Sequence, residues 1–207
     1  MVYFSNKKKI RGWKRQKAKI EIWKEQALHL DVDTLREYQR DYVKLWIDPF
    51  YSLEKRNPPH WYNQLLLEAM IDVYQEWNRK MEAENEEFYL KIWLFEPRFI
   101  QSQVVVAYRE ALHFYHHTFK KRENDKAFPF YQFHSLRDKL EQFDWSLHID
   151  SDYYDENDLQ GWLEEGLSSE KEISTIKRKA SETIKNEYGN HLIYCMDKGD
   201  VWIGTLK

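Results

Sequence analysis

The clearest pattern in the chain is an alternation between residues 88 and 95. Apolar residues at 88, 90, 92 and 94 alternate with a second set made up of Tyr89, Lys91, Trp93 and Phe95. Alternate positions of a β-strand point to opposite faces, so this segment predicts a strand with two distinct faces. A continuous apolar run at 104–106 follows a short break and is typical of a strand covered on both sides. We expect the two segments to form the centre of a sheet, with Trp93 and Val105 in its core.

Apolar residues recur at helical spacing in three segments that precede this predicted sheet centre. The first covers about residues 6–28, the second covers 33–46, and the third covers 57–81. Thr34 and Glu37 have the spacing of a capping box at the start of the second segment. The sequence therefore predicts three consecutive N-terminal helices.

The second half of the chain predicts further strands and one long helix. Segment 128–133 reads as an edge strand because Pro129 cannot donate a backbone hydrogen bond. Alternating apolar residues at 145–149 predict a strand, and we expect an acidic connector over 150–158. Ser169 and Glu172 form a predicted capping box for a long C-terminal helix over 169–188.

The last predicted element is a β-hairpin formed by segments 191–196 and 201–206 around the turn Asp197-Lys198-Gly199-Asp200. Together the elements predict an α+β fold: three N-terminal helices, a mainly antiparallel sheet of about four to six strands, and a long C-terminal helix followed by the hairpin. The chain of 207 residues shows no internal repeats and no low-complexity linker, so we expect a single domain over 1–207. Whether the basic helix at 6–28 protrudes from it stays open.

Composition narrows the class of protein more than its function. Aromatic residues make up 16% of the chain and the net charge is only −3, which indicates a folded protein with a mixed surface. The single cysteine, Cys195, excludes an intramolecular disulfide and favours a reducing compartment. A nucleophilic pair of Cys195 with His191 is conceivable, although nothing places a base beside the thiol. No signal peptide or membrane span is evident, so we expect a cytoplasmic protein.

The N-terminal segment concentrates positive charge, with eight basic residues and no acidic residue between positions 7 and 19. Lys8, Arg11, Lys14 and Arg15 are the candidate nucleic-acid-binding residues within it. The alternative is a helix docked by an apolar stripe that includes Trp13. We favour the docked helix, because the tryptophans of the segment lie on the stripe rather than on the basic face.

His113 and His117 are the best candidate metal ligands in the sequence. Whether their segment is a helix or a strand, the two residues share a face and could bind one Zn²⁺ ion. A third ligand would have to come from His148 or from a carboxylate in 150–158. Because no known metal-binding spacing supports the site, we predict that packed or surface histidines explain the pattern and that no cofactor is bound.

Several short signatures, spread over almost the whole chain, resemble the bacterial domain-of-unknown-function 3916 family of Gram-positive bacteria. They are Arg11-Gly12 with the basic residues after it, SQVVV at 102–106, WSLHI at 145–149, and WIGTL at 202–206. Segment 47–59 departs from the family pattern. The resemblance implies a bacterial, cytoplasmic, single-domain protein, and it implies no activity and no site residue.

Three functional hypotheses follow. The first is a non-enzymatic protein that binds another protein, for instance an immunity or antitoxin-like partner of a toxin, because the chain is rich in the aromatic residues that dominate interfaces and has no coherent catalytic set. The second is a nucleic-acid-binding accessory protein that uses the basic N-terminal helix. The third is a metal-dependent hydrolase centred on His113 and His117.

Overall fold

The computed structural model describes residues 13–29, 31, 42–46, 60–84, 88–96, 99–108, 119–123, 126–180, 182–185 and 192–207. Its strands are β1 (Tyr42–Trp46), β2 (Phe88–Phe95), β3 (Gln103–Tyr108), β4 (Phe119–Lys121), β5 (Phe143–Asp155), β6 (Glu182–Lys185) and β7 (Leu192–Leu206). They form one seven-stranded sheet in the order β1-β3-β2-β7-β5-β4, with β6 also paired to β7. Every described pairing is antiparallel.

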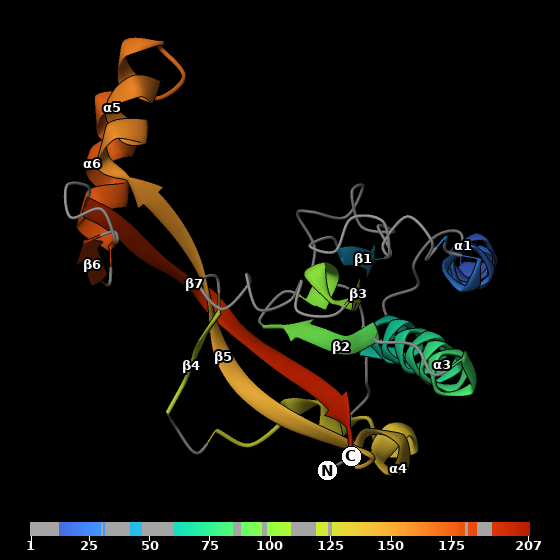
Figure 1. The fold of residues 1–207 in the computed structure, drawn as a ribbon. Coiled ribbons are helices and arrows are strands. Elements are labelled where there is room, and N and C mark those ends of the chain that lie inside the picture. The colour runs from blue at the N-terminus through green and yellow to red at the C-terminus, as the bar shows by residue number, and fades with distance from the viewer. Residues whose placement is uncertain are drawn as a thin grey trace, which may run out of the picture.

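The described helices are α1 (Trp13–Leu28), α3 (His60–Glu84), α4 (Arg137–Leu140), α5 (Glu156–Glu164) and α6 (Glu170–Lys179), with short 3-10 turns η2 (Phe99–Gln101), η4 (Pro129–Gln132) and η5 (His134–Leu136). Helix α3 packs on β2 and β3, whereas α5 and α6 lie at the far end of β5 and β7 (Figure 1). None of these described helices combines the length and apolarity needed to cross a bilayer.

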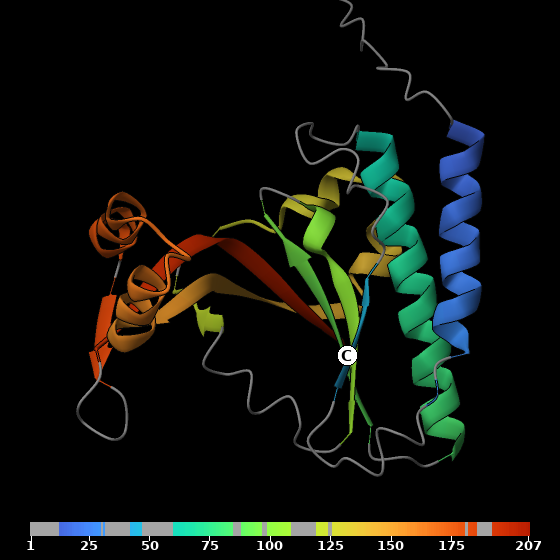
Figure 2. The ribbon, with the colours of Figure 1, turned by 90° about the horizontal axis from the view of Figure 1, so that it is seen from above.

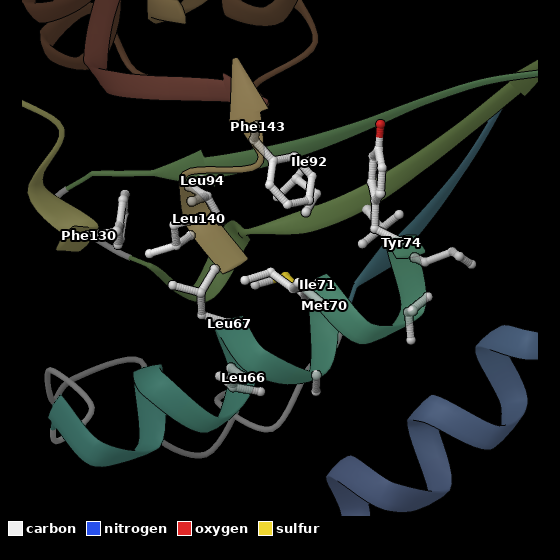
Figure 3. Packing of buried hydrophobic residues seen from close by; sticks show 14 of the residues in the cluster. Leu66, Leu67, Met70, Ile71, Tyr74, Ile92, Leu94, Phe130, Leu140 and Phe143 are labelled. Carbon is white, nitrogen blue, oxygen red and sulfur yellow. The ribbon is translucent and has the colours of Figure 1, made fainter. Parts of the chain in front are cut away.

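Helix α3 forms the centre of the main core because its apolar residues recur every three or four positions. Leu66, Met70, Val73 and Trp77 are buried, as the sequence predicts, and belong to one cluster with residues of β2 such as Ile92. Figure 3 shows this packing between α3 and the strands. The Tyr74 hydroxyl of α3 donates to the Leu90 carbonyl at 3.1 Å and accepts from the Leu206 N–H at 3.2 Å, so one side chain ties the helix to β2 and β7.

Helix α1 packs on the outer side of α3 (Figure 2). Ile20 and Ala27 of its apolar stripe are buried in the main core. The Trp77 indole donates to the Ala27 carbonyl at 2.9 Å, and Lys80 donates to the Leu28 carbonyl at 2.9 Å, so α3 side chains satisfy carbonyls at the end of α1. The part of α1 from Ile20 to Leu28 is therefore docked on α3, whereas residues 6–12 of the predicted helix lie outside the described residues.

The sheet centre also agrees with the sequence. Trp93 is 2% exposed and Val105 is fully buried. Strand β2 has the predicted bounds, and β3 contains the predicted valine run and lies between β1 and β2. The α+β class is correct, but the predicted order of elements is wrong.

The prediction of three N-terminal helices is wrong because residues 42–46 form strand β1 rather than the end of a helix. Val43 and Leu45 contact the main core, which is the two-residue period of a strand. The apolar residues of 33–46 fitted a helical period as well, and pairing with β3 decides the outcome for 42–46. The predicted capping residues Thr34 and Glu37 lie outside the described residues.

The long C-terminal helix is also wrong. Helix α6 begins with the predicted capping box of Ser169 and Glu172 but ends at Lys179, and Ala180 has a non-helical backbone conformation with φ −56° and ψ 123°. Residues 182–185 then form β6 on the edge of β7. Thr183 and Ile184 are β-branched, so strand pairing overrides the helical period that continued to residue 188.

Three smaller predictions fail for related reasons. The predicted edge strand at 128–133 is the 3-10 turn η4, with Pro129 in its first turn. The predicted acidic connector at 150–158 instead continues β5 to Asp155 and begins α5. The predicted terminal hairpin is one continuous strand, β7, which pairs with β5 along its length.

Candidate functional site

The sequence-predicted nucleic-acid-binding residues are only partly described. Lys8 and Arg11 lie outside the described residues, and Lys14 lies in α1. Arg15 is exposed on α1. Whether the four residues share a surface therefore lies outside the described residues.

The predicted metal ligands His113 and His117 lie outside the described residues. His148, the proposed third ligand, lies on β5 with its Nε2 atom 2.9 Å from the Ser146 hydroxyl oxygen. The part of the chain that the structure describes contains no group of three or more His, Cys, Asp or Glu side chains that could hold a metal ion. Cys195 lies in β7, where it pairs with Tyr153 of β5.

The feature that sequence reasoning missed is the length of the β5–β7 ribbon. Among the described residues, strand β7 pairs with β2 only through residues 201–204 and with β6 only through residues 192–195. The ribbon therefore leaves the main body and carries β6, α5 and α6 at its far end, as Figure 1 shows. We call its described residues 151–180, 182–185 and 192–197 the arm.

A β-bulge marks the point where the arm leaves the body. Asp150 pairs with Gly199 and Ser151 pairs with Asp197, which leaves Lys198 as an extra residue on β7. Gly199 has φ 144°, a conformation that glycine adopts far more readily than other residues. A bulge of this kind bends a strand and increases its twist. Residues 197–200 were predicted to form a hairpin turn, but they change the direction of one continuous strand.

Charged side chains surround this bulge, and we call the set the junction: Glu96, Arg122, Lys126, Asp150, Asp152, Asp197, Lys198 and Asp200. Arg122 contacts Asp197 at 2.8 Å and Asp200 at 2.9 Å. Lys126 contacts Asp200 and Glu96. These ion pairs connect β7 to the segment after β4 and to the end of β2.

The junction continues on the arm side of the bulge. The extra residue Lys198 contacts Asp152 at 2.9 Å. Burial raises the pKa of Asp150, the charges of Asp152 and Asp197 raise it further, and the cations Lys198 and Lys44 oppose the rise. Several ion pairs therefore join both strands of the ribbon at the bend where the arm leaves the body.

The arm has a small core of its own. Leu159 of α5 and Ile173 of α6 are buried, and the Trp162 and Tyr154 rings meet edge to face at 5.8 Å. Asp155 caps the start of α5 by accepting from the Asn157 N–H at 2.8 Å. These contacts hold the helix pair on the end of the ribbon.

The tip of the arm is the tight connection between α5 and α6. Gly166 has φ 68°, and the Leu167 N–H donates to the Trp162 carbonyl at 2.8 Å, which together with the Gly166-to-Leu163 bond forms a Schellman motif. Leu167 is 68% exposed. The tip therefore presents a large apolar side chain to solvent.

Acidic residues dominate the first part of the arm. Residues 152–170 contain seven acidic residues and no basic residue: Asp152, Asp155, Glu156, Asp158, Glu164, Glu165 and Glu170. Asp158, Glu164, Glu165 and Glu170 are exposed. A shallow hollow on α6 next to the tip is lined by Ser168, Ser169, Lys171, Glu172, Thr175 and Ile176. The arm thus combines an exposed leucine with exposed negative charge.

No family model, curated protein or solved structure matches the chain. The functional argument therefore rests on the geometry of the protein itself.

Proposed function

We propose that this protein is a non-enzymatic protein-binding protein that engages its partner with the arm. The observation that carries the proposal is the α5–α6 tip, held away from the body on the β5–β7 ribbon and presenting Leu167 to solvent. Burial of an exposed apolar side chain favours association, and Leu167 is the most exposed large hydrophobic residue among those that the structure describes.

The negative charge at the end of α5 indicates the chemistry of the partner surface that would meet Leu167. Glu164 and Glu165 are exposed beside Leu167 at the end of α5. A partner surface that carries a small apolar pocket surrounded by lysine or arginine would complement this tip. Electrostatic complementarity of this kind accelerates association and makes it sensitive to salt. An immunity or antitoxin-like role, in which the partner is a toxin, is the specific form of the proposal.

Site-specific photo-crosslinking tests the arm as the interface. A benzophenone amino acid at Leu167 should give a discrete adduct with the partner in cells, whereas the same probe at Ile22 should not. Ile22 is the matched control because it is also a large apolar residue that is more than half exposed, and it lies on α1.

Purified partner then gives the decisive measurement. Leu167→Asp combined with Glu164→Lys and Glu165→Lys should weaken binding by roughly tenfold or more. The control Ile22→Asp with Glu21→Lys and Glu25→Lys makes the same chemical changes on α1, where all three side chains are exposed, and should bind normally. Equal affinity of both variants would reject the proposal. For a toxin partner, co-expression should restore growth with the control but not with the arm variant.

A further inference from the structure

Helix α1 docks through one side and leaves the opposite side open. Ile20 and Ala27 are buried in the main core, and the helix packs on the outer side of α3 (Figure 2). Ala18 lies two and a half turns before Ala27 in a helix of about 3.6 residues per turn, so it points away from α3. Ala18 is exposed. Docking on α3 therefore holds the helix without covering its outer side.

Positive charge lies on both flanks of this outer side. Successive residues of a helix are separated by about 100° around its axis, so Lys17 and Lys19 lie on opposite flanks of Ala18. Arg15 lies one turn before Lys19 on the same flank. All three basic residues are exposed. We call Arg15, Lys17, Ala18 and Lys19 the cationic face of α1.

The described contacts give no structural reason for the three cations of this face. Among the described residues, none of the three forms an ion pair with an acidic side chain, whereas Lys24 of the same helix contacts Asp72 at 2.9 Å. The acidic residues Glu21 and Glu25 follow in the second half of α1. The helix dipole favours the reverse order, with acidic residues near the start of a helix and basic residues near its end. An anionic ligand would supply the interaction that these cations lack.

We propose that the cationic face of α1 binds duplex DNA, with Ala18 toward the floor of the major groove and the three basic side chains contacting phosphates on its two walls. A helix with its side chains is about 10–12 Å across, and the major groove of B-form DNA is about 12 Å wide. A helix with cations on both flanks therefore fits between the two phosphate backbones. Phosphate contacts carry no sequence information, so duplexes of different sequence should bind.

Other anionic ligands fit the cationic face less well. Single strands bind through stacking of bases on aromatic rings, and this face has no ring. The major groove of duplex RNA is deep and narrow, and side chains do not read it. A helix that lies on a membrane needs a broad apolar face, but the apolar face of α1 is packed on α3. Duplex DNA is therefore the ligand that this geometry favours.

Glu21 and Glu25 define where the contact ends. Both are exposed, and both lie within two turns after Lys19. Their carboxylates repel phosphates, so the first half of α1 lies in the groove and the second half lies away from the backbone. Recognition helices of DNA-binding proteins also contact the bases with their N-terminal residues.

Fluorescence anisotropy tests the proposal on the full chain, with a labelled duplex DNA of mixed sequence and about 20 base pairs in about 50 mM salt. Arg15→Gln combined with Lys17→Gln and Lys19→Gln should weaken binding roughly tenfold or more. Loss of three phosphate contacts should also reduce the slope of log K against log salt by about 2.7. Glu21→Gln combined with Glu25→Gln should strengthen binding roughly twofold or more, because two charges that repel phosphates are removed.

A matched control removes the same charge from the arm. Lys171→Gln with Arg178→Gln and Lys179→Gln replaces one arginine and two lysines that are exposed on α6, and it should leave DNA binding unchanged. Thermal unfolding followed by circular dichroism should show that the cationic-face variant is as stable as the wild type, because no described ion pair is lost. Leu167→Asp should also bind DNA normally, so failure of this proposal and failure of the arm proposal are separate results.

Each remaining outcome decides the question. Equal loss of binding in the cationic-face variant and in the α6 control would show a general effect of charge and overturn the proposal. Absence of binding at low salt, or tighter binding of duplex RNA or single-stranded DNA, would also overturn it. So would binding that persists in the cationic-face variant but disappears when Lys7, Lys8 and Lys9 are replaced by Gln. Selective loss in the cationic-face variant, with duplex DNA bound most tightly, would establish the site.

Discussion

At the scale of single residues, Gly204 shows how close the packing of the ribbon is. It pairs with Trp145 of β5, and an added Cβ atom would lie 2.7 Å from the Trp145 Cε3 atom. The Trp145 ring is held in place: it stacks on Phe128 at 4.5 Å, and its N–H donates to the Leu140 carbonyl at 2.9 Å. The ring therefore has little freedom to give way.

Gly204→Ala should lower the free energy of unfolding by about 1–3 kcal/mol, because the new methyl group overpacks the site. The control is Gly161→Ala in α5, where a Cβ atom meets nothing within 4 Å. Alanine favours a helix over glycine, so this control should raise stability by about 0.5–1 kcal/mol. Urea denaturation measures both changes, and a Gly204→Ala protein as stable as the wild type would contradict the packing described.

Asp72 gives a pH-dependent prediction at the same scale. It accepts from Lys24 of α1 and from Lys139 of α4, both at 2.9 Å. Burial acts to raise the pKa of Asp72, but the hydrogen bonds from Lys139 and Lys24 outweigh it and hold the pKa below its usual range. The ionised carboxylate thus links two elements that are distant in sequence.

Asp72→Asn should cost about 1 kcal/mol at neutral pH. A lowered carboxyl pKa stabilises the fold above the unfolded-state value of about 3.9, and this contribution is lost as the pH falls through the lower folded-state pKa. The stability difference between wild type and Asp72→Asn should therefore be constant near neutrality and shrink below about pH 4. Asp144→Asn, an exposed change on β5, should show no such difference. A difference that grows in acid would reject this account.

Much of the burial at individual positions could be predicted from the sequence. Trp93, Val105, Met70 and Trp77 are buried as their spacing indicates. The tight approach of Gly204 to Trp145 could not be predicted, because it depends on a cross-strand register that joins residues far apart in the chain.

At the scale of elements, helix α6 shows a local signal that was strong enough to define a boundary. The Ser169 hydroxyl accepts from the Glu172 N–H at 3.3 Å, and the Glu172 carboxylate accepts from the Ser169 N–H at 2.8 Å. These contacts involve residues only three positions apart, so the start of the helix was predicted correctly. Its end depends on pairing between β6 and β7, which local spacing does not contain.

Ser169→Ala should destabilise the arm by about 1 kcal/mol through loss of the cap. Hydrogen exchange followed by mass spectrometry should show faster exchange in 170–179 and unchanged exchange in α3. Ser174→Ala is the control, since it is exposed within the same helix and alanine is the better helix former. Equal exchange in the two variants would mean that the capping box contributes nothing.

The arm was not predicted from the sequence for the same reason: its formation depends on pairing between distant segments rather than on local residue spacing. Asp197-Lys198-Gly199-Asp200 has the residues of a turn, and a turn there predicts a hairpin. Because β5 supplies a partner on both sides of this sequence, the glycine instead accommodates a bulge and the strand continues. The arm could not be recognised without that pairing.

At the scale of the whole molecule, the arm and the body have separate cores. Both clusters of the body consist entirely of described residues outside the arm. The arm's own buried residues include Leu159 and Ile173. The body should therefore keep its structure without the arm.

Replacement of residues 152–196 by Asn-Gly tests this separation. Ser151 and Asp197 are direct partners in the ribbon, so a two-residue turn of this type should close it as a tight hairpin. The shortened protein should retain a cooperative unfolding transition, keep the helical signal of α1 and α3, and lose the protein partner captured through Leu167. An insoluble or non-cooperative product would show that the body depends on the arm.

The central position of β7 also determines the order in which the fold can be completed during synthesis. Strands β2 and β5 both need β7 between them, yet β7 is the last of the described strands to leave the ribosome. Until then β2 has an unpaired edge, and the place of the buried Trp202 in the main core is empty. Contacts between segments so far apart in the chain form slowly, and open strand edges favour aggregation. Rapid overexpression should therefore divert part of the protein into inclusion bodies, because chains accumulate before β7 has paired.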